Sequence, residues 1–359
     1  MTDAATRLAR LVECVPNVSE GRRPGVVEEI VAAFAGADPG VLVLDRSSDP
    51  DHDRTVLTLA GPGPALVEAA VAGARACARL IDLNRQRGVH PRMGALDVVP
   101  FVPLGEATRL RGGADPDLDC AALADRAGRR IAAEAGVPVY LYGAAARRPE
   151  RAALPAVRGR GFEALRAALA DGEPGSPGDP PGQAPDLGGP GLHPTAGATA
   201  VGAREVLIAY NVELAGADLE LARRIAATVR ERDGGLPAVR AMGVALEQRG
   251  GRGDRRGGPP VGRGGPGDRR GGPPVGRRLV QVSMNLLDHK VTPPAAAFAA
   301  VAELAGRAGA RVVASELVGL IPAAAMAGTD PADLLLPGDT PDRFLETRLA
   351  RALDHAEVS

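Results

Sequence analysis

One order of strand and helix patterns occurs twice along this chain, and no other feature limits the possible folds as strongly. In the first copy, apolar or β-branched runs predict strands at residues 11–18, 41–45, 54–60 and 96–104. Helical spacing predicts helices at 24–34 and 65–81. The first helix begins at Pro24, a residue favoured in the first helical turn. The order is therefore strand, helix, strand, strand, helix, strand.

The second copy follows a segment at 171–190 that is rich in Gly, Pro and Asp and is typical of a linker. Its predicted strands are 205–214, 238–247, 279–287 and 310–317, and its predicted helices are 218–230 and 294–308. Two copies of this order predict an α+β protein with two ferredoxin-like subdomains, each a sheet covered by helices. We place them at 1–183 and 184–329, with a C-terminal tail at 330–359. A ligand cleft between them is expected.

Charge and cysteine content exclude several classes of protein. The 359 residues include 43 Lys and Arg against 44 Asp and Glu, so the balance does not favour nucleic acid or a membrane surface as partner. The three cysteines form no C-x-x-C pair, and the N-terminus has no signal-peptide core. The apolar stretch 64–81 contains three charged residues, which a membrane span rarely accepts. We therefore expect a cytoplasmic protein without a membrane span.

An insert at 249–278 interrupts the second copy between its two middle strands. Residues 253–263 recur without change as 267–277, and almost nothing in them can be buried, so the insert is predicted to be disordered. Its Arg-Gly-Gly repeats beside two ferredoxin-like units leave RNA binding open as a remote alternative. The central strands predicted at 54–60 and 279–287 contain no aromatic residue on which bases could stack, which argues against it.

His90 is the candidate for chemistry. It lies between Gly88 and Gly94 and precedes Pro91, which favours an extended loop that presents the imidazole. A histidine that titrates near neutrality can accept a proton from an attacking amine and return it to a leaving one. A hydrogen-bonded structural histidine is the competing interpretation. The adjacent Arg92 could bind a substrate carboxylate.

Other polar patterns are weaker. The alternation of Asp49, Asp51 and Asp53 lacks the Gly and Glu of a calcium loop, and the histidines show no zinc-binding spacing, so no metal is expected. The stretch 188–197 is either a ligand loop or a plain linker, and it lacks the Gly-Lys-Ser/Thr of a phosphate loop. Asn211 and Asn285 interrupt apolar strands and either bond the backbone or face a substrate.

These motifs together resemble the glutamate formimidoyltransferase family, which includes the formiminotransferase part of formiminotransferase-cyclodeaminase. The blocks that carry the resemblance are 11–21, 80–82, 88–103, 137–143, 184–188, 197–204, 281–286 and 315–322. The resemblance implies two ferredoxin-like subdomains and transfer of the formimino group from N-formimino-L-glutamate to the co-substrate tetrahydrofolate, giving 5-formiminotetrahydrofolate and L-glutamate in histidine degradation. It also implies a homodimer, and another protein for the cyclodeaminase step.

Within the resemblance, His90 matches the catalytic histidine. The folate-binding stretch that it implies, in the cleft between the subdomains, consists of Gly188, Gly189, Pro190, Gly191, Leu192, His193, Pro194, Thr195, Ala196 and Gly197. The family usually has an aromatic residue and a Pro where this chain has Leu187, Gly188 and Gly189, and often a bulkier residue at Ala196. The nearer alternative is an enzyme like 5-formyltetrahydrofolate cycloligase, although no nucleotide motif is visible.

Overall fold

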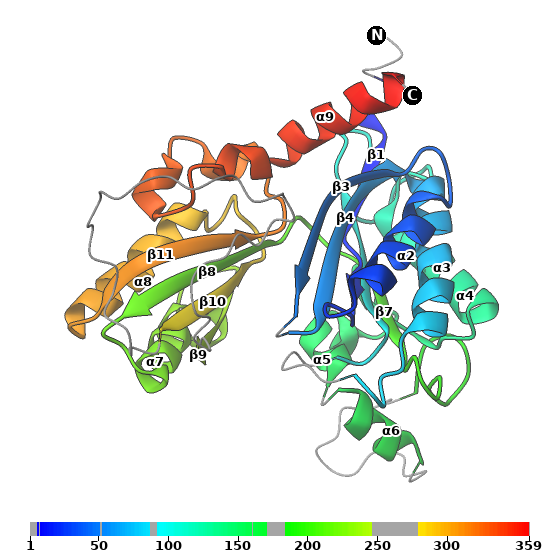
Figure 1. Ribbon diagram of the computed structural model, residues 1–359, viewed down its shortest axis with the longest axis horizontal. Coiled ribbons are helices and arrows are strands. Elements are labelled where there is room, and N and C mark those ends of the chain that lie inside the picture. Colours follow the sequence, from blue (N-terminus) through cyan, green and yellow to red (C-terminus); the bar gives the residue numbers. More distant parts are fainter. Residues whose placement is uncertain are drawn as a thin grey trace, which may run out of the picture. The chain divides into compact units, whose positions relative to one another are not determined.

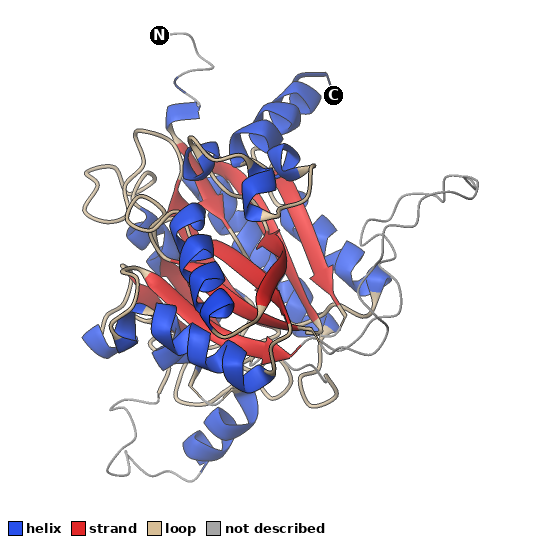
Figure 2. Cartoon of the chain, turned by 90° about the vertical axis from the view of Figure 1, so that its left-hand side faces the viewer, coloured by secondary structure: helices blue, strands red, loops and turns tan. Residues whose placement is uncertain are grey.

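The computed structural model describes residues 6, 8–50, 52–86, 92–159, 161–170, 184–245 and 279–358 (Figures 1 and 2). The chain forms two compact units. Unit 1 consists of Met1–Val206, Gly319–Pro322 and Pro341–Ser359, and unit 2 consists of Leu207–Val318 and Ala323–Thr340. Each unit contains one β-sheet, so the chain is an α+β protein with two sheets.

The sheet of unit 1 has seven strands. They are β1 (Leu11–Cys14), β2 (Asn17–Val18), β3 (Leu42–Asp49), β4 (Arg54–Pro62), β5 (Leu96–Pro103), β6 (Val139–Gly143) and β7 (Thr199–Ala203). The predicted strand 11–18 is divided into β1 and β2, which flank Val15 and Pro16. Both parts lie between β4 and β5 and are antiparallel to them. Strands β7 and β6 extend the sheet in parallel beyond β5.

Three helices pack together over this sheet: α2 (Pro24–Ala35), α3 (Gly63–Leu80) and α4 (Cys120–Glu134) (Figure 1). Phe34 of α2 is fully buried against α3. A Cβ on Gly73 of α3 would lie 2.1 Å from the Phe34 ring, so only glycine allows the two helices to approach this closely. Unit 1 also contains η1 (Pro149–Arg151), α5 (Leu154–Arg158) and α6 (Phe162–Ala170).

The sheet of unit 2 has four antiparallel strands in the order β11-β8-β10-β9. They are β8 (Ile208–Ala215), β9 (Val239–Ala245), β10 (Val280–Leu286) and β11 (Arg311–Val318), with α7 (Leu219–Val229) and α8 (Pro294–Arg307) between them in sequence. Short helices are η2 (Glu231–Asp233), η3 (Ala323–Met326) and η4 (Pro331–Leu334). Tyr210 and Val212 alternate with half-buried Asn211, and Asn285 is exposed. The two amides therefore do not lie in the core.

The compact units differ from the predicted division at 183/184, because β7 joins the first sheet by pairing with both β5 and β6. The C-terminal segment also packs on unit 1. After η5 (Thr340–Arg343), helix α9 (Leu345–Val358) contacts β3, and Leu345 shares an apolar cluster with Leu44 and Ala60. The subdomain boundaries remain a prediction. The insert 249–278 and most of the predicted linker lie outside the described residues.

Among the residues that the structure describes, no helix combines the length and the apolar character needed to cross a membrane.

Candidate functional site

One edge of the first sheet gathers four connecting segments. Strand β2 ends there, and because it is antiparallel to β4 and β5, both of these strands begin there. Strand β7 is parallel to β5 and begins at the same edge. The described residues of these segments are 19–23, 49–50, 52–53, 84–86, 92–95 and 193–198. The sequence order alone does not show that they are neighbours.

Residues 193–198 pack against both flanks of the predicted His90 loop. The backbone N–H of Leu83 donates to Thr195 O at 2.9 Å, before the loop. After it, Ala95 N donates to Ala196 O at 2.9 Å and Ala198 N donates to Met93 O at 3.0 Å. The structure therefore joins residues 195–198 to Leu83, which precedes His90 in sequence, and to Met93 and Ala95, which follow it. His90 itself lies in the part of the chain that is not described, so its role stays a prediction.

Close backbone contacts at this edge require glycine. Gly197 has φ +69°, and a Cβ there would lie 2.2 Å from Met93 O. A Cβ on Gly94 would lie 2.0 Å from Ala198 O. Gly188 and Gly189 also have positive φ values, of 91° and 93°. Gly188, Gly189 and Gly197 of the predicted folate stretch therefore adopt backbone conformations that favour glycine, whereas Gly191 does not require it.

His193 fixes the turn at the end of the same stretch. Its Nδ1 accepts hydrogen bonds from Ala196 N at 3.0 Å and Thr195 N at 3.3 Å. An Nδ1 that accepts these bonds carries no proton, so the neutral ring holds its proton on Nε2. Partial burial lowers the pKa of His193 below its usual value. This part of the stretch therefore contains a neutral imidazole whose Nδ1 is engaged by the turn and whose proton is on Nε2.

A buried carboxylate lies just beyond the predicted loop. Asp97 is fully buried, and its Oδ1 accepts a hydrogen bond from Met93 N at 2.8 Å. Its Oδ2 accepts from Arg54 Nη1 at 3.0 Å and from Arg158 Nη2 at 2.9 Å. Burial alone would raise the pKa of Asp97, but the Arg158 and Arg54 guanidinium groups hold it below its usual range. We call Asp97, Arg54 and Arg158 the Asp97 cluster.

Asn17 orients one arginine of the Asp97 cluster. Its Oδ1 accepts from Arg54 Nε at 3.1 Å and from Arg54 Nη2 at 2.6 Å. Its own Nδ2 donates to Val15 O at 2.9 Å. Burial lowers the pKa of Arg54, while Asp97 opposes that shift. Because an arginine pKa starts above 12, Arg54 remains charged.

Arg92 is held by protein groups. Its Nη2 donates to Leu83 O at 3.0 Å and to Gln86 O at 3.2 Å, and it forms an ion pair with Glu163 Oε1 at 3.0 Å. The Glu163 side chain is 57% exposed. A substrate carboxylate at Arg92 would have to compete with Glu163. The substrate-binding role of Arg92 remains a prediction.

The turn at 19–23 is tied to the same edge by two acidic residues. Glu20 accepts hydrogen bonds from the backbone N–H groups of Arg22 and Arg23, both at 2.8 Å. Asp53, with φ 50°, accepts from Gly21 N at 3.0 Å, and burial raises its pKa. Asp51 lies outside the described residues. Within the described part of the chain, no three His, Cys, Asp or Glu side chains gather as metal ligands.

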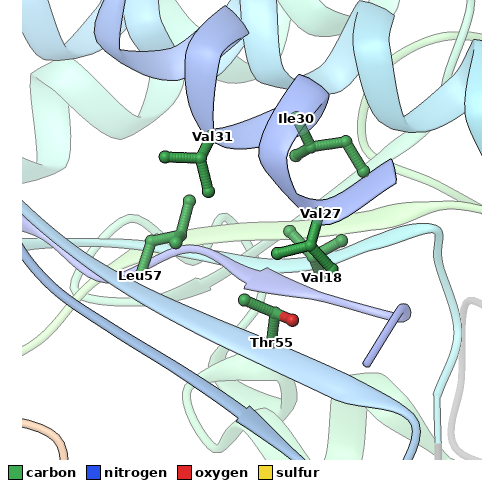
Figure 3. Close-up of a pocket in the computed structure, with 6 residues that line it drawn as sticks. All are labelled: Val18, Val27, Ile30, Val31, Thr55 and Leu57. Carbon is green, nitrogen blue, oxygen red and sulfur yellow. The ribbon is translucent and has the colours of Figure 1, made fainter. Parts of the chain in front are cut away.

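Figure 3 shows a pocket beneath α2 that is not a ligand site. It is lined by Val18, Val27, Ile30, Val31, Thr55 and Leu57. The space is too small for a water-sized molecule. The Thr55 hydroxyl already donates to Glu20 O at 2.6 Å. We interpret this pocket as a packing gap between the helix and the sheet.

Comparison with known proteins assigns the family. The family description "Formiminotransferase domain, N-terminal subdomain" matches residues 11–204, and "Formiminotransferase domain" matches residues 276–334. The chain belongs to the formiminotransferase family. The first match extends past the predicted boundary at 183 and ends just after β7.

Relatives of this family resemble the chain over most of its length. The glutamate formimidoyltransferase of Thermoplasma acidophilum is 37% identical over 95% of this chain and 98% of its own length. The glutamate formimidoyltransferase of Streptococcus pyogenes is 36% identical over 89% of this chain and 91% of its own length. The formimidoyltransferase-cyclodeaminase of Gallus gallus is 39% identical, but this chain spans only 51% of it. The formiminotransferase resemblance of the sequence is confirmed.

Sequence reasoning missed the residues that form the Asp97 cluster. Asn17 and Asp97 both lie in blocks that carry the formiminotransferase resemblance, and Asp97 is a charged residue within an apolar strand. A charged residue within an apolar strand could have indicated a buried ion pair, because a buried charge requires partners. No local pattern pointed to Arg54 or Arg158, which come from distant parts of unit 1.

Proposed function

We propose that this protein transfers the formimino group from N-formimino-L-glutamate to tetrahydrofolate, giving 5-formiminotetrahydrofolate and L-glutamate. The observation that carries the proposal is the match to both formiminotransferase descriptions, together with 37% identity to a glutamate formimidoyltransferase over 98% of that enzyme. The hydrogen bonds of residues 195–198 to Leu83, Met93 and Ala95 support it, because these residues precede and follow His90 in the sequence.

His90 is the proposed general acid and base. In its neutral form it accepts the proton of folate nitrogen 5 as that nitrogen forms its bond to the formimino carbon. It then donates the proton to the glutamate nitrogen as the bond from that nitrogen to the carbon breaks. Residues 188–197 are the proposed folate-binding stretch, and tetrahydrofolate is the co-substrate.

His90→Ala tests this role. We expect the turnover number to fall about a hundred- to ten-thousandfold, which is the usual contribution of a positioned general acid-base. The control is the substitution of His355 by Ala, in the last turn of α9. Near-normal turnover of the His90→Ala protein would contradict the assignment.

A paired assay tests the reaction itself. The purified protein is given formiminoglutamate with tetrahydrofolate in one arm and 5-formyltetrahydrofolate with ATP in the other. We expect product only in the first arm. Product only in the second arm would replace the proposal with the cycloligase alternative.

The finer architecture is also proposed. We infer that each subdomain is ferredoxin-like, which is supported by the shared strand order: β3-β4-β1/β2-β5 in unit 1 corresponds to β9-β10-β8-β11 in unit 2. The homodimer is inferred from the family resemblance alone, and the cytoplasmic location from the scattered cysteines of the sequence. Light scattering of the purified protein tests the dimer.

A further inference from the structure

We propose that Arg158, held in place by Asp97 beside Arg54, forms a subsite for a substrate carboxylate. The inference rests on the proposed formimino transfer, because both of its substrates contain carboxylates: formiminoglutamate itself, and the glutamate moiety of tetrahydrofolate. The shared chemistry is a carboxylate that meets the Arg158 guanidinium group, with the positive charge of Arg54 nearby.

The arrangement of charge supports this subsite. Two guanidinium groups share one oxygen atom of one buried carboxylate, with Arg54 Nη1 at 3.0 Å and Arg158 Nη2 at 2.9 Å from Asp97 Oδ2. Planar guanidinium groups recognise carboxylates through paired N–H donors, and their attraction for an anion increases when water is excluded. The Arg54 and Arg158 side chains are 13% and 16% exposed. Each arginine is thus largely desolvated but still partly open to solvent.

Arg151, a buried arginine of unit 1, differs from this pair. Arg151 is 6% exposed and faces a carboxylate of its own, Asp186, at 2.6 Å. Its Nη2 also donates to Ala184 O at 2.7 Å. A structural role is sufficient to explain this one-to-one ion pair between Arg151 and Asp186. The sharing of one Asp97 oxygen by two arginines is less easily explained by structure alone.

The position of the subsite fits the reaction. Asp97 Oδ1 accepts from Met93 N, and Met93 O accepts from Ala198 N, so the cluster is connected by two hydrogen bonds to the residue that follows the folate stretch. Ser19 Oγ donates to Gly94 O at 2.7 Å and fixes the same turn. A carboxylate bound by Arg158 would therefore lie at the sheet edge where the flanks of the His90 loop meet residues 193–198.

Arg92, the sequence-based candidate for this task, is less suited to it. Both of its Nη atoms donate to Glu163, and Nη2 also donates to two backbone carbonyls. We therefore infer that Arg92 stabilises the backbone at Leu83 and Gln86, and that Arg158 binds the substrate carboxylate.

The experiment compares Arg158→Gln and Arg158→Lys with the wild type. We measure KM for formiminoglutamate, KM for tetrahydrofolate and the calorimetric affinity for L-glutamate, with the urea midpoint as a check on folding. Loss of a charged hydrogen bond should raise one KM about ten- to a hundredfold in Arg158→Gln. Arg158→Lys should raise it less, because lysine keeps the charge and loses the planar fork. Arg158→Lys also carries the test if the Gln protein fails to fold.

The readouts distinguish the source of the carboxylate. A higher KM for formiminoglutamate with weaker L-glutamate binding identifies the amino-acid substrate, whereas a higher KM for tetrahydrofolate alone identifies the folate. The matched control is Arg130→Gln on α4, where the arginine pairs with Glu134 and Glu68 and is 33% exposed. If the wild type is active and both KM values of the Arg158 variants stay within about twofold of it, the subsite is wrong. A wild type that binds L-glutamate but lacks transferase activity would refute the proposed reaction instead.

Discussion

Asp97 and Glu13 are both buried carboxyl groups on strands of the same sheet, yet their pKa values shift in opposite directions. Burial raises the pKa of Glu13 to about 7, and Arg204 offsets only part of that effect. At Asp97, burial acts in the same sense, but the guanidinium groups of Arg158 and Arg54 outweigh it and lower the pKa. Burial alone therefore does not set the charge of a carboxyl group; the number of cations that reach it does.

The largest expected effect is the removal of the charge at Asp97. Asp97→Asn leaves two largely buried guanidinium groups without their shared carboxylate, and such a loss typically costs about 3–5 kcal/mol. We expect this decrease in the free energy of urea unfolding at pH 7. The pKa of Asp97 is lower in the folded protein than in the unfolded chain. The stabilisation by its carboxylate is therefore present at neutral pH and is lost as the pH falls below the ordinary value of 3.8. The difference between variant and wild type should therefore shrink in acid.

A loss of less than about 1 kcal/mol at neutral pH would contradict this interpretation. It would show that the Asp97 carboxylate contributes little to keeping Arg54 and Arg158 buried. The electrostatic environments of Asp97 and Glu13 would then differ less than the directions of their pKa shifts indicate. Asp125→Asn is a suitable control, because Asp125 forms ion pairs with Arg129 and Arg147 but its side chain is 35% exposed.

Glu13 should give the next largest effect, with the opposite dependence on pH. Its folded pKa of about 7 lies above the ordinary value of 4.5, so between these values the folded state binds more protons than the unfolded state. The contribution of Glu13 to the free energy of unfolding therefore falls as the pH rises from about 4.5 to about 7, by up to about 3 kcal/mol. Glu13→Gln carries no charge at any pH and should remove this slope.

The measurement is the free energy of unfolding at several pH values for Glu13→Gln and wild type. We expect Glu13→Gln to gain stability relative to wild type as the pH rises through this window. Parallel curves would mean that Glu13 titrates at its ordinary value and is better solvated than its 6% exposure indicates.

Elements that depend on local sequence patterns could be predicted, whereas those that depend on partners far away in the sequence could not. Periodicity predicted 24–34 and 294–308 as helices, and the structure has α2 at Pro24–Ala35 and α8 at Pro294–Arg307. Strand β7 was missed because its short run of small residues becomes a strand only through pairing with β5 and β6. The Asp97 cluster was missed for the same reason, since its partners Arg54 and Arg158 lie 43 and 61 residues away.

The smallest expected effect concerns the exposed ion pair between Arg92 and Glu163. Glu163→Gln removes a carboxylate that is 57% exposed, and Arg92 keeps its hydrogen bonds to Leu83 O and Gln86 O. Exposed ion pairs contribute about 0–1 kcal/mol, so we expect a change in unfolding free energy within that range and nearly unchanged KM values. A loss above about 2 kcal/mol would show that Arg92 is as strongly coupled to its acid as the arginines at Asp97. A large decrease in the KM for formiminoglutamate would instead mean that Glu163 competes with the substrate for Arg92, and would return the carboxylate-binding role to that residue.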